Sequence, residues 1–321
     1  MGLCPYDYGE EKMMNQLSFK PLSIVALTAF SLNIAPAFAA TPTGIQDAIP
    51  VAKSLNGIKK DDGWYNLSSA SKTKTVDGTP VTIAGIPGGG FPGMAPLPNV
   101  ISQVSSDNDS SATFRKVSNG ATGGAFPSSD SLYAGSFSGA FNVNGGKLGV
   151  FETAPVDNLA NVVFQVEIGG ANGYDFYQPS VGNTTTIGDA STHAAGALAV
   201  TNYFPTLNLT FSNNTTTQLT ANWAELSTKG ENGTTSAGGT EEPIYINLYA
   251  FQWDLSGYSN ISSFNVTFDV VAHSQTYAAR LTQSDTFNQV VAVPVPEPES
   301  YAMVLAGLGL VGFVARRRRH V

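Results

Sequence analysis

The chain has 321 residues, enough for one large or two small domains with a hydrophobic core, and its single cysteine, Cys4, excludes an intramolecular disulfide and a cysteine metal site. Only 12% of the residues are charged, and residues 40–295 hold 10 Lys and Arg against 19 Asp and Glu, a net charge of −9. That balance offers no basic stripe for phosphate contacts, so we do not expect nucleic acid as a partner.

The N-terminal region has the three parts of a secretory signal peptide. Lys20 supplies the positive charge, residues 22–32 form an apolar run, and Ala37-Phe38-Ala39 is an A-x-A cleavage site. A buried core helix is the alternative, but prolines stand at both ends of the segment and it has no amphipathic period. The pattern predicts export by the Sec machinery and cleavage after Ala39.

The residues before this segment do not fit a signal peptide. Asp7, Glu10 and Glu11 place acidic groups where such a peptide carries basic ones. We therefore expect translation to start at Met13 or Met14, within a leader that spans residues 1–39.

Residues 40–98 are expected to form an irregular, linker-rich region. A short helix broken at Pro50 is the alternative over residues 43–60, and residues 78–98 contain too many glycines and prolines for a regular element.

The stretch "SSDNDSS" raises the question of a calcium site. Asp107 and Asp109 have the alternating oxygen spacing that begins many calcium loops. Ala112 occupies the position where an EF-hand requires glycine, so an EF-hand is excluded. A surface loop with Asx turns is the main interpretation, and a calcium site in a β-sandwich loop is the alternative.

Residues 99–293 carry the alternation typical of antiparallel strands. In "NVVFQVEI" (161–168) the residues Val162, Phe164, Val166 and Ile168 share one face and Gln165 and Glu167 the other, and 207–211 and 264–272 repeat the pattern. Turn-rich breaks separate these segments, and no segment keeps a helical period. The sequence predicts an all-β fold, an antiparallel β-sandwich of jelly-roll type. His273 is expected on a solvated polar strand face.

One strand, "IYINLYAFQWDL", allows two interpretations. Four aromatic side chains share one face: Tyr245, Tyr249, Phe251 and Trp253. Either this is a central strand buried on both sides, or the face is an open platform on which sugar rings stack. Exposing four aromatic residues would lower solubility, which favours burial.

Catalytic and cofactor motifs are missing from the sequence. It contains no H-E-x-x-H or Walker motif, and Glu241 and Glu242 are adjacent, so in a strand their side chains would point apart. We therefore expect a non-enzyme without a cofactor, calcium excepted.

The C-terminal segment resembles a membrane stop. Pro296-Glu297-Pro298 must be extended, because proline fixes its own φ and restricts its predecessor. Residues 301–315 form an apolar run that is about 22 Å long as a helix, which is a marginal membrane span. Four basic residues follow and should remain cytoplasmic: Arg316, Arg317, Arg318 and Arg319.

This order of Pro-Glu-Pro, apolar span and arginine cluster resembles the PEP-CTERM sorting signal, here over residues 294–321. The resemblance implies that Pro296, Glu297 and Pro298 are recognised by exosortase, a membrane-embedded enzyme, after the precursor is anchored in the inner membrane. It also implies release at the cell surface and an association with exopolysaccharide.

Three classes of function follow for the body. The first is a non-catalytic surface or matrix protein, the second is a secreted carbohydrate-binding module, and the third is a secreted hydrolase. The hydrolase has the weakest support, because no acid–base constellation stands out in the sequence.

Overall fold

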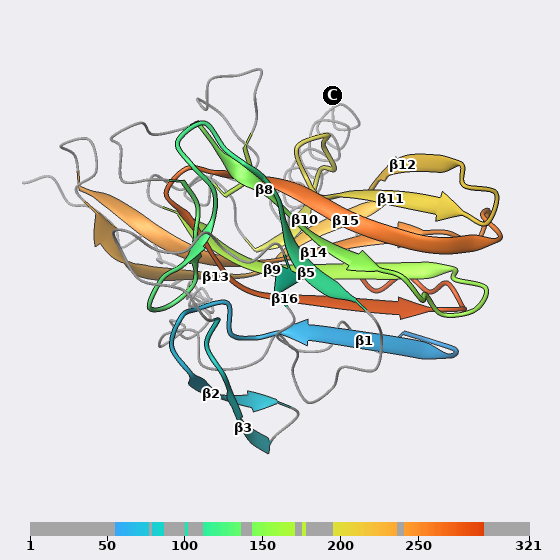
Figure 1. Cartoon of the computed structure of the whole chain (residues 1–321), viewed down its shortest axis with the longest axis horizontal. Helices are drawn as coiled ribbons and strands as arrows, with labels where there is room; N and C mark the ends of the chain where they lie inside the picture. The colour runs from blue at the N-terminus through green and yellow to red at the C-terminus, as the bar shows by residue number, and fades with distance from the viewer. Residues whose placement is uncertain are drawn as a thin grey trace, which may run out of the picture. The chain divides into compact units, whose positions relative to one another are not determined.

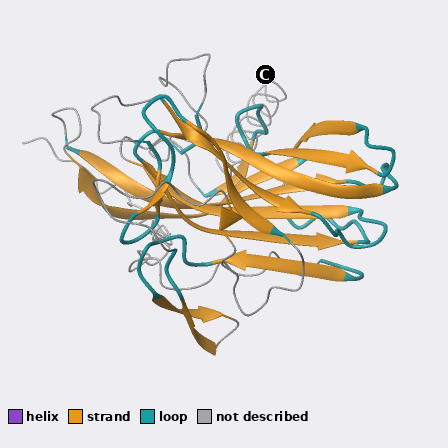
Figure 2. Cartoon of the chain, in the orientation of Figure 1, coloured by secondary structure: helices purple, strands orange, loops and turns teal. Residues whose placement is uncertain are grey.

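The described part of the chain is entirely β-structure. A computed structural model describes residues 55–76, 79–86, 100–101, 112–135, 143–170, 175–177, 195–235 and 241–291. All of them belong to the second of two compact units, Ala39–Val321. Within these residues there is no helix, and every strand pairing is antiparallel (Figure 2). The prediction of an all-β antiparallel fold is confirmed.

The larger sheet contains eight strands in the order β10-β13-β14-β9-β16-β7-β6, and β1 also pairs with β16 (Figure 1). Its strands are β1 (Lys59–Trp64), β6 (Phe126–Pro127), β7 (Leu132–Tyr133), β9 (Asn161–Gly170), β10 (Gly196–Leu198), β13 (Trp223–Thr235), β14 (Glu242–Asp254) and β16 (Ser274–Ser284).

The smaller sheet contains six strands in the order β12-β11-β15-β8-β5-β4. They are β4 (Val100–Ile101), β5 (Thr113–Asn119), β8 (Asn144–Glu152), β11 (Thr206–Phe211), β12 (Thr216–Thr220) and β15 (Ile261–Val271). A separate hairpin is formed by β2 (Lys72–Val76) and β3 (Thr79–Ile83).

The alternating residues of the two sheets meet in one apolar core. Val162, Phe164 and Val166 of β9 are fully buried, as is Val266 of β15, and all belong to a single cluster of buried side chains. The rings of Phe164 and Phe268 lie 5.7 Å apart and join the sheets directly. Period-two alternation produces this arrangement, because it places every second side chain on the same face of a strand.

The face of the larger sheet that points away from this core is also covered. Tyr65 and Ile83 pack on Leu248 and Ala278, and Leu55 and Val291 pack on Val163 and Ala250 in a further cluster. The covering residues flank β1, lie on β3, or stand at the end of the described chain: Leu55, Tyr65, Val81, Ile83, Val290 and Val291. The expected polar face of 161–168 is therefore not solvated: Val163 and Gln165 are buried.

The expectation of an irregular region over residues 40–98, with no regular element in 78–98, needs correction, because three strands lie there: Lys59–Trp64, Lys72–Val76 and Thr79–Ile83. Lys59–Trp64 is a strand of the larger sheet and pairs with β16 along its whole length (Figure 1). The sequence "KKDDGW" conceals this, because Asp61 makes an ion pair with the buried Arg280 and Asp62 is itself fully buried. Charges that are paired inside the fold interrupt the apolar alternation by which strands are recognised.

Substitution of Trp64 tests whether β1 contributes to the core. Its side chain is fully buried, and its ring lies 6.0 Å from that of Phe114 in the opposite sheet. We expect Trp64→Ala to lower the free energy of unfolding by about 3–5 kcal/mol, because it removes a large buried ring and leaves a cavity. Urea unfolding followed by circular dichroism measures the loss. Ile58→Ala is the control, since Ile58 is 68% exposed; equal effects of the two substitutions would contradict the assignment.

Candidate functional site

The residues of the sorting signal and the leader lie outside the described part of the chain. This holds for Ala37 and Ala39, for Pro296, Glu297 and Pro298, and for Arg316, Arg317, Arg318 and Arg319. Among the described residues, no helix has the length and apolar character needed to cross a membrane.

One buried amide makes several of the contacts that hold the segment leading into the C-terminal tail. Gln252 of β14 is fully buried, and its Oε1 accepts hydrogen bonds from the backbone N–H groups of Val290 and Val291 at 2.9 and 3.0 Å. Its Nε2 donates to the backbone carbonyl of Asn288 at 2.7 Å and to Asn161 Oδ1 at 2.9 Å. Three of these four contacts reach residues 288–291 and the fourth fixes the amide to β9, so Gln252 anchors residues 288–291 on the sheet.

The aromatic strand is buried, so the platform interpretation needs correction. Tyr249, Phe251 and Trp253 are at most 2% exposed and lie in the core between the sheets, where Phe176 contacts the first two rings. Tyr245 is only half-buried, with Lys229 Nζ 4.4 Å from its ring centroid. The apolar residues Ile246, Leu248 and Ala250 on the opposite side of β14 were the sequence signal for a strand buried on both faces.

The possible calcium ligands Asp107 and Asp109 also lie outside the described residues. Within the ranges that the structure describes, no group of three or more His, Cys, Asp or Glu side chains could hold a metal ion.

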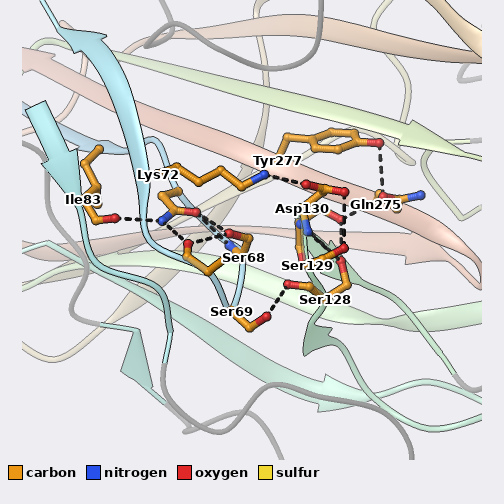
Figure 3. A network of polar contacts seen from close by, with 12 residues as sticks. Ser68, Ser69, Lys72, Ile83, Ser128, Ser129, Asp130, Gln275 and Tyr277 are labelled. Atoms are coloured by element: carbon orange, nitrogen blue, oxygen red, sulfur yellow. Dashed lines mark hydrogen bonds and ion pairs between the residues drawn. The ribbon is translucent and has the colours of Figure 1, made fainter. Parts of the chain in front are cut away.

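A polar network fastens the β2–β3 hairpin to the larger sheet (Figure 3). Lys72 Nζ lies 2.6 Å from Asp130 Oδ1, and the hydrogen bond from this lysine is the main cause of a lowered pKa at Asp130. Ser69 donates to the carbonyl oxygen of Ser128 at 2.8 Å. Tyr277 of β16 donates to Gln275 Oε1 at 3.1 Å in the same network. The network ties loops to strands far apart in the sequence.

Glu167 carries the most perturbed carboxyl group for which the structure gives a pKa. It pairs with Leu248 on one side and Ala278 on the other, both buried and apolar, and its Oε2 has no hydrogen-bond partner. Burial raises the pKa of Glu167 to about 7, and the positive charge of the buried Lys74 opposes that shift. Burial also raises the pKa of Tyr277, and the charge of Glu167 adds to the effect.

The prediction of a solvated strand histidine at position 273 is wrong. His273 lies in the two-residue connection between β15 and β16, has a φ of 73°, and is 8% exposed. Its Nδ1 lies 2.6 Å from the Tyr133 hydroxyl. Apolar residues alternate along β15 as far as Val270, and the chain then turns. The alternation therefore does not predict on which side of the sheet His273 lies.

Two of the hollows that open to solvent are formed by loops and strands of the described body. The larger, of about 930 Å³, is lined by loops at one end of the sheets and includes Asp157, Tyr258 and Asp285. The smaller, of about 360 Å³, lies where β11, β12 and β15 approach Tyr177 and Tyr203. Sequence reasoning found neither, because both bring together residues from distant segments.

Comparison with known proteins identifies the tail. The profile of one protein family, described as PEP-CTERM protein-sorting motif, matches residues 294–319. No curated protein and no solved structure matches the chain. The resemblance of the C-terminal segment to this signal is confirmed. The motif implies an exported protein whose membrane-anchored precursor is processed by exosortase.

The pKa of Glu167 predicts how stability depends on pH. Because its folded-state pKa lies above the ordinary 4.5, the folded chain binds the proton more tightly, and stability falls as pH rises from 4.5 to 7. We expect Glu167→Gln to raise the free energy of unfolding at pH 8 by about 1–3 kcal/mol and to change it little at pH 4.

Urea unfolding of the two proteins at both pH values measures this difference. Glu231→Gln is the matched control, because Glu231 is an exposed glutamate of the same sheet. An effect of Glu167→Gln that is equal at pH 4 and pH 8 would contradict the proposed cause.

Proposed function

We propose that this chain is a non-catalytic surface or matrix protein of an exopolysaccharide layer. The observation that carries the proposal is the match of residues 294–319 to the PEP-CTERM sorting motif. In this proposal the leader directs Sec-dependent export, the tail holds the precursor in the inner membrane, and exosortase acts on Pro296-Glu297-Pro298. The processed body then reaches the cell surface or the surrounding matrix.

The topology follows from the charges at the two ends. A signal peptide cleaved after Ala39 directs the chain that follows it out of the cytoplasm. Residues 316–319 are four consecutive arginines, each of which costs about 2.5–3.5 kcal/mol at the centre of a membrane helix, so the far end stays inside. The body and the Pro-Glu-Pro motif are thereby held on the outer side of the inner membrane.

We also propose that the body is a β-sandwich of jelly-roll type. Support comes from the strand orders β12-β11-β15-β8 and β14-β9-β16-β1, and from the repeated crossing of the chain between the sheets. Jelly rolls are built from two such antiparallel sheets of Greek-key strands.

A structural role for the body is favoured by its ion pairs. Asp61 pairs with Arg280, Asp130 with Lys72, and Asp269 with Lys147. The hydrolase interpretation draws on Glu167, because a pKa of about 7 suits a general acid. Glu167, however, packs between Leu248 and Ala278 under the β2–β3 hairpin, where no substrate reaches its carboxyl group. We therefore propose no enzymatic activity.

The start of the exported protein tests the signal-peptide assignment. N-terminal sequencing of the exported protein should begin at Ala40, because the A-x-A site ends at Ala39. Exported protein that retains residues upstream of Met13 would contradict the signal-peptide assignment.

Substitution of Glu297 tests the role of the tail. Glu297→Ala should impair processing while leaving export and anchoring intact, because Glu297 is the only charged group of the Pro-Glu-Pro motif. Mass and membrane fractionation of the protein, in hosts with and without exosortase, measure the outcome. Glu299→Ala is the matched control, a glutamate two residues further on and outside the motif.

Deletion of residues 316–319 should act differently. Without its arginines the short apolar run loses its stop, so the precursor should leave the membrane fraction. If both hosts yield the same uncut, membrane-held protein and Glu297→Ala has no effect, the tail is an anchor alone.

A further inference from the structure

The outer face of the smaller sheet is the open sheet face of the body. Along β11 and β15, side chains alternate between buried apolar residues and accessible polar ones, and the edge strand β12 is accessible along its whole length. The three central strands of the larger sheet, β14, β9 and β16, are instead buried on both faces over most of their length. A ligand that lies along a sheet therefore has access to the smaller one.

Amides and hydroxyls form two rows across this open face. In one row Gln218, Asn208 and Asn265 stand opposite one another on β12, β11 and β15, and Asn208 Nδ2 donates to Asn265 Oδ1 at 2.9 Å. In the next row Thr206 pairs with Thr220 and with Thr267. Each amide and hydroxyl offers both donors and acceptors, which is the hydrogen-bonding character that sugar hydroxyls require.

Two tyrosines stand where the rows reach the smaller hollow. Tyr177 and Tyr203 both line this space of about 360 Å³, a volume that falls in the range of small-ligand pockets, about 300–1,000 Å³. Gln218 and Thr267 line it as well, so the polar rows continue into the hollow.

Buried neighbours hold both tyrosines in place. Phe176 and Phe204, each next to one of the tyrosines in the chain, are at most 2% exposed, and their rings contact each other at 5.6 Å inside the core. The backbone N–H of Tyr177 donates to the carbonyl oxygen of Asp269 at 3.0 Å. Both tyrosines are half-buried and are fixed before any ligand arrives, which reduces the entropy cost of binding.

The charges of the hollow select against ionic ligands. Lys147 Nζ lies 3.3 Å from Asp269 Oδ2, so the two charges compensate each other, and both side chains are about one-third exposed. The net charge of −9 over residues 40–295 repels polyanions in addition. The combination of tyrosine rings, amides, hydroxyls and a compensated ion pair fits a neutral ligand that is rich in hydroxyl groups.

We propose that this hollow and the adjoining rows bind a neutral saccharide chain. The tyrosine rings pack on the apolar C–H faces of the sugar, and the amides and the Lys147–Asp269 pair exchange hydrogen bonds with its hydroxyls. The inference deepens the proposed function, because it assigns the contact with exopolysaccharide to a defined site, distinct from the buried aromatic face of β14.

Titration calorimetry on the full chain tests the proposal. The protein is purified in a detergent without a sugar headgroup, so that the detergent cannot compete for the site. The probes are cellohexaose, mannohexaose, maltohexaose, chitohexaose and a galactohexaose, with hexagalacturonate as the acidic comparison. We expect saturable binding of at least one neutral probe and none of the acidic one.

Substitutions locate the binding. Tyr177→Ala and Tyr203→Ala should each weaken the affinity about tenfold through loss of ring contact. Gln218→Ala should weaken it severalfold without affecting the fold, because Gln218 is exposed on the edge strand β12. Tyr258→Ala is the matched control, an exposed tyrosine in the larger hollow, and should leave the affinity unchanged. Circular dichroism verifies that each variant is folded.

Three outcomes would overturn the proposal: no binding of any neutral probe, binding of hexagalacturonate alone, or affinity that is lost in Tyr258→Ala and kept in Tyr177→Ala and Gln218→Ala. The assay uses purified protein, so its result does not depend on exosortase processing. Failure of the saccharide site and failure of the sorting proposal are therefore distinguishable.

Discussion

The arrangement on which the rest of the body depends is the burial of the larger sheet on both faces. Its central strands β14, β9 and β16 contact the smaller sheet on one side and, on the other, Leu55, Tyr65, strand β3 and residues 290–291. The described body contains no cysteine, so its stability comes from this double burial and its hydrogen bonds. The same burial removes the aromatic face of β14 from contact with ligands, whereas the outer face of the smaller sheet stays accessible.

Burial also explains why several charged and polar side chains inside the fold are paired with one another. Asp61 accepts hydrogen bonds from Arg280 and, at 2.7 Å, from Thr282. These bonds compensate the charges of Asp61 and Arg280, which the fold shields from water. The anchor on Gln252 belongs to the same cover, because it holds residues 288–291 against β14 and β9. Only four residues lie between Val291 and Pro296, and the five Cα–Cα steps between them reach at most about 18 Å. An enzyme that acts on the Pro-Glu-Pro motif therefore works close to the folded body.

Sequence reasoning succeeded where one physical rule decides the outcome. The strands of Val162–Ile168 and Phe264–Val270 follow from alternation alone, because each has one face on a shared core. The tail could be recognised from the sequence because its prolines, apolar run and arginine cluster lie together in one continuous segment, residues 294–319.

The features that the sequence could not provide all depend on contacts between distant segments. The charged strand Lys59–Trp64 is stabilised by Arg280, more than 200 residues away, and no local pattern reveals that pair. The burial of Val163 and Gln165 requires segments that pack on the sheet from elsewhere in the chain. The hollow beside Tyr177 and Tyr203 forms only when Phe176 and Phe204 meet in the core.

The small fraction of charged residues in the chain affects how its contacts respond to salt. Contacts between exposed charges are screened beyond about 8–10 Å at ordinary ionic strength, and they weaken further as salt increases. Hydrogen bonds from amides and hydroxyls and the packing of tyrosine rings depend far less on salt. A protein exported into surroundings of uncontrolled ionic strength retains its contacts with a neutral polymer if it relies on such groups. The rows around Asn208 and Thr206 and the compensated pair Lys147–Asp269 have that character. Because only 12% of all residues are charged, uncharged polar groups also predominate over charged ones in the rest of the chain.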